Sequence, residues 1–243
     1  MDILKNSTIN LALFAAAATG TMVGEATDAH MLVYACKPVM LVVLSSWFFF
    51  NTRRVGDRLT LLIQAGLFFS LVGDVALMFQ HLDDFNFLIG LAAFLIAQLC
   101  YTIAFIQNIA DVGAGRPPWL PMLISIGLIV FCYFFTERLL PAADEAIRIP
   151  VGVYAVAITA MGIAAAFRWG RTYPRSFYLV FCGALCFIIS DSLLAINRFI
   201  SPFEAASWSV ILTYAMAQVM IVLGILAHVL DPDEIRRRAA LVT

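Results

Sequence analysis

Two aspartates stand inside long apolar runs and are the residues of this chain best suited to chemistry. Asp74 lies in residues 68–79, FFSLVGDVALMF, and Asp191 lies in residues 181–199, FCGALCFIISDSLLAINRF. A carboxyl group at membrane depth costs at least ~2.5 kcal/mol on insertion scales, so it usually faces the interior of a helical bundle and has a function. Two of them in one chain indicate a polar site shared by two helices.

Other polar residues fall on helical faces that could complete such a site. Ser70 precedes Asp74 by one turn, and pairs such as Gln98 and Tyr101 share a helical face. The candidate supporting residues are Lys37, Arg198, Asn197, Ser70, Ser190, Gln98, Tyr101, Tyr214 and Gln218. Three alternatives remain open. The neutral residues could be interhelical hydrogen-bonding groups, Lys37 with Asp74 could form a purely structural ion pair, and Arg198 could be an anchor at the membrane interface.

The composition shows which elements must position these residues. The chain of 243 residues is 63% hydrophobic and 13% charged, with a mean hydropathy of +0.94, which excludes an ordinary soluble domain. Eight apolar runs are long enough to span a bilayer. We therefore expect an all-α protein with one eight-helix transmembrane domain over residues 1–243, spanning at about 9–25, 31–50, 59–80, 84–108, 118–136, 149–168, 176–199 and 206–230.

Charge alternates between successive connections, which predicts an orientation. One set of connections and termini is basic, with Lys5, Arg53, Arg54, Arg58, Arg116, Arg168, Arg171, Arg175 and Arg236–Arg238. The other set is mainly acidic, with Glu25, Asp28, Asp83, Asp84, Asp144, Glu145 and Glu204 against Arg138 and Arg148. The positive-inside rule then places both termini in the cytoplasm. In that orientation Lys37, Asp74 and Asp191 lie about 9–12 Å below the outer boundary, with Arg198 at the rim.

Several other kinds of site are excluded by the pattern. His30 and His81 fall on the outer side and His228 near the inner end, so a three-histidine zinc site fails. The chain has no GxSxG or Walker motif, and we expect neither a metal nor a cofactor, nor any nucleic-acid partner. The five cysteines lie in apolar runs without CxxC spacing, which indicates no disulfide framework. Trp47, Trp119, Trp169 and Trp208 are expected at the membrane interface.

Five segments resemble the YhhN-type lysoplasmalogenase family. They are KPVM at 37–40, SLVGDVALMF at 70–79, GLAAFLIAQLCY at 90–101, SDSLLAINRF at 190–199 and YAMAQVMIVLG at 214–224. The resemblance implies an integral membrane hydrolase that cleaves the vinyl ether of lysoplasmalogens to a fatty aldehyde and glycerophosphocholine or glycerophosphoethanolamine. We expect the protein in a bacterial inner membrane, with its site toward the outer side. It also implies that Asp74 and Asp191 are the family's aspartates. A histidine often occupies the place of Gln98 in the family, so Gln98 is not an obligatory proton carrier here.

The implied reaction fits the residues. A vinyl ether hydrolyses by protonation of its β-carbon to an oxocarbenium ion, which one protonated carboxyl and one carboxylate can assist. The sequence leaves open which aspartate is the acid, although pairing of Lys37 with Asp74 would favour Asp191. An alternative function is a small proton-coupled transporter or lipid-binding membrane protein, because the two aspartate segments lie four helices apart, as in an internal duplication. Against transport, no acidic path continues to the cytoplasmic face.

Overall fold

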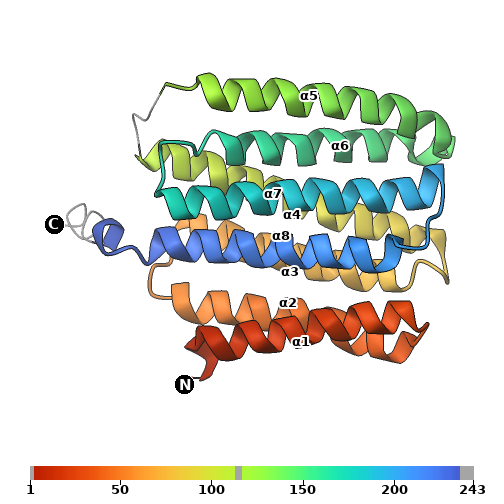
Figure 1. The fold of residues 1–243 in the computed structure, drawn as a ribbon, viewed down its shortest axis with the longest axis horizontal. Coiled ribbons are helices and arrows are strands. Elements are labelled where there is room, and N and C mark those ends of the chain that lie inside the picture. Colours follow the sequence, from red (N-terminus) through yellow and green to blue (C-terminus); the bar gives the residue numbers. More distant parts are fainter. Residues whose placement is uncertain (1–2, 113–116, 236–243) are drawn as a thin grey trace.

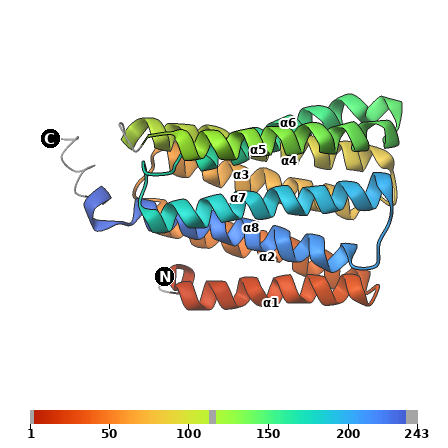
Figure 2. The ribbon, with the colours of Figure 1, turned by 45° about the horizontal axis from the view of Figure 1, so that its top comes forward.

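The computed structural model describes residues 3–112 and 117–235, and these form one bundle of long helices (Figures 1 and 2). The helices are α1 Ser7–Ala26, α2 His30–Thr52, α3 Arg58–Met78, α4 Asp84–Val112, α5 Trp119–Leu139, α6 Glu145–Ala166, α7 Pro174–Ala195 and α8 Ala206–Val229. Three short helical turns, η1 Ile3–Lys5, η2 Leu140–Ala142 and η3 Ile196–Ile200, flank them. All eight long helices have the length and composition to cross a membrane, which confirms the predicted all-α class with eight candidate membrane-spanning helices.

Local signals in the sequence explain where several helices begin. The side chain of Asn6 accepts a hydrogen bond from the backbone nitrogen of Ile9 (3.1 Å) at the start of α1. Asp57 does the same for Thr60 (2.9 Å) at the start of α3. Pro174 opens α7, where its missing N–H leaves no hydrogen bond unmade. These caps satisfy backbone groups that a helix end would otherwise leave without a partner.

The helices pack mainly as sequential neighbours, which fixes the place of the site. The hairpins α1–α2, α3–α4 and α7–α8 each pack closely, and α4 also packs against α6. At one edge of the bundle lies α1, and at the opposite edge lies α5, which packs mainly on α6 (Figures 1 and 2). Only Pro121 and Leu139 of α5 are buried. Most of α5 therefore offers its apolar side chains to the surroundings, as expected of a helix in lipid.

Two glycines let α3 and α4 approach closely beside the predicted site. A Cβ atom on Gly66 would stand 2.4 Å from the Tyr101 ring, and one on Gly73 would stand 2.6 Å from the Phe94 ring. Real side chains do not approach to such distances, so only glycine fits at either position. The aromatic rings of α4 consequently lie directly against the backbone of α3 on either side of Ser70.

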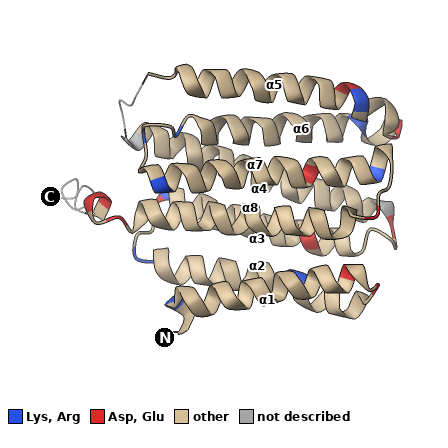
Figure 3. Ribbon diagram, viewed as in Figure 1, with Lys and Arg blue, Asp and Glu red and all other residues tan. Residues whose placement is uncertain are grey.

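Most charged residues lie at the two ends of the helices (Figure 3), but one basic residue is buried. Arg168, predicted among the basic residues of a connection, is 0% exposed. Its Nε donates to Asn108 Oδ1 (3.0 Å), its Nη2 donates to Ser176 Oγ (2.8 Å), and its guanidinium lies over the Phe105 ring. This burial lowers the pKa of Arg168 to about 9.

The structure also bears on the predictions made for the tryptophans and the cysteines. The interface prediction is wrong for Trp47, which is 2% exposed and packs in the core, because its position on α2 faces the bundle rather than the lipid. All five cysteines are free, as predicted. Arg116 and Arg236–Arg238, which contributed to the predicted orientation, lie outside the described residues.

Candidate active site

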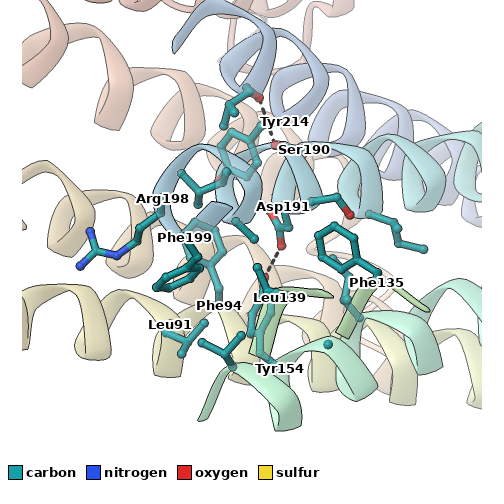
Figure 4. A pocket seen from close by; sticks show the side chains of 18 of the residues that line it. Leu91, Phe94, Phe135, Leu139, Tyr154, Ser190, Asp191, Arg198, Phe199 and Tyr214 are labelled. Atoms are coloured by element: carbon teal, nitrogen blue, oxygen red, sulfur yellow. Dashed lines mark hydrogen bonds between the residues drawn. The ribbon is translucent and has the colours of Figure 1, made fainter. Parts of the chain in front are cut away.

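A cavity of about 130 Å³ collects the intramembrane charges, and Figure 4 shows part of its lining. Helices from α2 to α8 contribute to its wall. Its lining includes nine residues with a polar or charged side-chain oxygen or nitrogen: Lys37, Asp74, Tyr154, Thr159, Ser190, Asp191, Ser192, Arg198 and Tyr214. Six of these nine residues were predicted from the sequence, and Tyr154, Thr159 and Ser192 were not. Side chains that are far apart in the chain thus share one small space.

Asp74 has a hydrogen-bond or ionic partner on each of its carboxyl oxygens. Lys37 Nζ lies 3.5 Å from Oδ1, and the Tyr214 hydroxyl donates to Oδ2 at 2.7 Å. Tyr214 is in turn held by edge contacts with the rings of Phe94 and Phe187, at centroid distances of 5.9 and 5.5 Å. Asp74 itself is only 2% exposed. The lysine and the hydroxyl donor both favour the ionised form of this carboxyl, and its burial opposes that form.

Asp191 has a different environment. The Tyr154 hydroxyl donates a hydrogen bond to Asp191 Oδ2, and Figure 4 shows this tyrosine reaching toward the carboxyl from α6. Within residues 3–112 and 117–235, no lysine or arginine forms a salt bridge with Asp191, and no donor contacts its Oδ1. The two carboxyls of the cavity therefore differ: one is paired with a cation and the other is not.

Tyr154 is the missed cavity residue that contacts an aspartate, by its hydrogen bond to Asp191. It stands in GVYAV within a long apolar run, and tyrosines are common in membrane helices for packing reasons alone. The available signal was weak: among Val151–Ile158 it is the one side chain with a polar group. A search for polar residues facing α7 from the sixth span would have found it.

Arg198 lies at the rim, but on a helical turn of unexpected geometry. The seventh helix ends in the π-helical turn η3, so the regular α-helical spacing that predicted its position does not extend to Arg198. The side chain still lines the cavity, donates from Nη1 to Gln80 Oε1 (3.0 Å) and covers the Phe87 ring at 3.9 Å. Asn197 does not line the cavity, since its Oδ1 accepts a hydrogen bond from the backbone nitrogen of Phe203 (3.2 Å).

Four other predicted residues form a buried layer beside the cavity rather than part of its wall. Tyr101 donates to Gln218 Oε1 at 2.9 Å, and Ser70 lies beside the Tyr101 hydroxyl. Gln98 lies beside the Tyr154 hydroxyl, although its amide makes no hydrogen bond of good geometry. The residues outside the cavity wall are therefore Ser70, Gln98, Tyr101, Gln218 and Asn197. Ser190 lines the wall but donates to the backbone oxygen of Val210 (3.0 Å).

The remainder of the wall is apolar. It includes Leu77, Leu91, Phe94, Phe131, Phe135, Leu139, Val151, Ile158 and Ile188. On α6 the lining residues run from Val151 to Thr159, a distance of about 12 Å along the helix. In the part of the chain that is described, no group of three or more histidine, cysteine or acidic residues could hold a metal ion. The cavity is thus amphipathic, with an arginine at its rim, two carboxyls within and an apolar extension along α5 and α6.

The fold and this cavity define a polytopic integral membrane protein with a pair of carboxyls in one cavity. The chain matches the YhhN family over residues 32–225 and belongs to that family. It is 31% identical over 202 residues to "Lysoplasmalogenase TMEM86A" of Bos taurus, covering 78% of this chain and 75% of the relative. It is also 31% identical over 204 residues to "Lysoplasmalogenase" of Mycobacterium tuberculosis, covering 82% and 72%. No solved structure matches the chain.

Proposed function

We propose that this protein is a lysoplasmalogenase, which hydrolyses the vinyl ether bond of a lysoplasmalogen to a fatty aldehyde and a glycerophosphocholine or glycerophosphoethanolamine. The names of its relatives support this substrate. The structural observation that carries the proposal is the unequal pair of carboxyls in one amphipathic cavity, Asp74 beside Lys37 and Asp191 without a cation. Such a pair supplies an acid and a carboxylate to the same substrate group.

The unequal environments support an assignment of roles. Asp74, with Lys37 and Tyr214 on its two oxygens, serves as the permanent carboxylate. Asp191 serves as the general acid, because a carboxyl in a largely apolar cavity and without a cationic partner favours its neutral form. Lys37 therefore acts indirectly, since it determines which of the two carboxyls holds the proton.

The reaction then follows in three steps that conserve protons. Asp191 transfers its proton to the β-carbon of the vinyl ether, so that its O–H bond breaks and a C–H bond forms. The resulting oxocarbenium ion is stabilised by the Asp74 carboxylate, as in glycoside hydrolysis. Water adds to the cationic carbon and loses a proton to the Asp191 carboxylate, which restores the acid. The hemiacetal collapses to the aldehyde and the alcohol.

The remaining features of the cavity suit a lysophospholipid. Arg198 at the rim can hold a phosphate bidentately, and the apolar wall along α5 and α6 can accept the alkenyl chain. The ether bond of a lysolipid lies just below its headgroup, which matches carboxyls just below an arginine. We further propose that the cavity opens on the non-cytoplasmic side of a bacterial inner membrane, because connections at that end carry Glu25, Asp28 and Asp83.

Aldehyde release from lysoplasmalogen by the purified protein in detergent tests the proposal. The saturated 1-alkyl ether analogue is the control substrate, because it cannot be protonated to an oxocarbenium ion and must be inert. Asp74→Asn and Asp191→Asn should each remove most of the activity, whereas Asp144→Asn, at an exposed position, should not. Retention of more than about a tenth of the wild-type rate, about 1.4 kcal/mol in barrier, would exclude that carboxyl from the chemistry.

The same assay separates hydrolysis from the transporter alternative. A transporter or lipid-binding protein that uses the same aspartates would leave lysoplasmalogen intact while still binding it or moving protons. Absence of aldehyde from folded wild-type protein, together with proton uptake into vesicles, would therefore favour transport over hydrolysis.

A further inference from the structure

The hydroxyl of Tyr154 occupies one oxygen of Asp191 and leaves the other free. The hydrogen bond ends on Oδ2, and within the described residues no hydrogen-bond donor reaches Oδ1. Both residues line the cavity, so Oδ1 is the oxygen available to a substrate. The geometry around Asp191 is thus asymmetric before any ligand binds.

This asymmetry determines where a proton on Asp191 can reside. A neutral carboxyl has one O–H group and one carbonyl oxygen, and a hydroxyl donor bonds to the carbonyl oxygen. Gln98, the other polar side chain beside the Tyr154 hydroxyl, has an amide oxygen without a hydrogen bond, so Asp191 is the acceptor of the hydroxyl proton. With Oδ2 accepting from Tyr154, the proton of neutral Asp191 resides on Oδ1.

We propose that Tyr154 is a positioning residue, which keeps the transferable proton of Asp191 on Oδ1 and stabilises the Asp191 carboxylate after the proton has left. This inference rests on the proposed function. Hydrogen bonds to an ionised acceptor are roughly twice as strong as those to a neutral one. Tyr154 therefore stabilises Asp191 more after proton transfer than before it, which lowers the barrier to protonation of the substrate.

The other ionisable groups of the cavity do not duplicate this role. Those that line it are Lys37 on α2, Asp74 on α3, Cys132 on α5, Arg198 on η3 and Tyr214 on α8. Tyr214 makes the same kind of bond to Asp74, but Lys37 occupies the second oxygen there. The Tyr214–Asp74 pair has no oxygen left over for a transferable proton, so the two tyrosine–aspartate pairs are not equivalent.

Infrared spectroscopy tests the position of the proton without relying on activity. In ester-free detergent, the wild-type protein should show the carbonyl stretch of a buried carboxylic acid, sensitive to exchange into D₂O. Asp191→Asn should abolish this band and Asp74→Asn should not. Tyr154→Phe should move the band to higher frequency, because its carbonyl oxygen loses a hydrogen bond. Tyr178→Phe, at a tyrosine exposed outside the cavity, is the matched control and should leave the band unchanged.

Kinetics give the second readout. Tyr154→Phe should lower kcat by about 10- to 100-fold, about 1.4–2.7 kcal/mol, with little change in KM. A Tyr154→Phe protein with an unmoved band and a wild-type kcat overturns the positioning role, while aldehyde release by the wild-type protein leaves the proposed function standing. Conversely, if the wild-type protein has no activity but Tyr154→Phe shifts the band as expected, the proposed function is wrong and the assignment of the proton to Oδ1 stands.

Discussion

The ion pair between Lys37 and Asp74 yields the most quantitative prediction. At an N–O distance of 3.5 Å and an effective dielectric constant near 20, the Coulomb attraction is about 5 kcal/mol. Desolvation of both groups opposes it, so the net coupling between the two side chains is smaller, about 1–3 kcal/mol. That coupling can be isolated with Lys37→Met, Asp74→Asn and the double variant.

The two single variants should differ in cost. Lys37→Met leaves a buried carboxylate with only Tyr214 as its partner, which costs about 3–5 kcal/mol. Asp74→Asn removes the carboxylate and leaves a lysine whose side chain is 16% exposed and can extend toward the rim, so it should cost less. The double variant contains neither unpaired charge and should be more stable than the sum of the single effects predicts.

Equilibrium unfolding of the four proteins in mixed micelles measures this coupling. Lys37→Met combined with Asp144→Asn is the control, because these positions share no contact and their effects should add within about 0.5 kcal/mol. If the Lys37 and Asp74 effects add equally well, the pair does not interact energetically. The assignment of Asp74 as the permanent carboxylate would then lose its basis.

Two other predictions concern packing and substrate binding. Gly66→Ala should destabilise the protein by about 1–3 kcal/mol in the same unfolding assay, because its Cβ would meet the Tyr101 ring at 2.4 Å. Gly127→Ala, which adds a Cβ in open space, should instead be neutral or stabilising by up to about 1 kcal/mol. Equal losses of stability in the two variants would contradict the packing argument. Arg198→Ala should raise KM for lysoplasmalogen and leave kcat nearly unchanged. A fall in kcat at constant KM would place Arg198 in the chemistry, and no effect would make it an interfacial anchor.

The sequence was informative where physical constraints were strong. Charged residues in apolar runs are so costly that Lys37, Asp74 and Asp191 could be expected to converge, and all three line one cavity. Span lengths are constrained by the bilayer, which is why the eight helices could be predicted. The orientation across the membrane and the catalytic roles stay predictions.

The misses arise where local sequence carries less information. Helical periodicity gives the face of a residue but not whether a cavity extends to its level. Tyr101 and Gln218 were therefore predicted as site residues, although they lie in the buried layer beside the cavity. A π-helical turn has no clear sequence signature, and it changed the surroundings of Asn197. Tyr154 was missed because an isolated tyrosine in an apolar run is compatible with ordinary packing.

Arg168 has a consequence for the biogenesis of this protein. Insertion machinery orients a nascent membrane protein by its basic residues before the helices have packed, and at that stage Arg168 adds a positive charge to its connection. In the folded protein the same guanidinium is buried between Asn108 of α4 and Ser176 of α7. In the predicted orientation, the same residue would act first as a topological signal and later as a buried contact between α4 and α7.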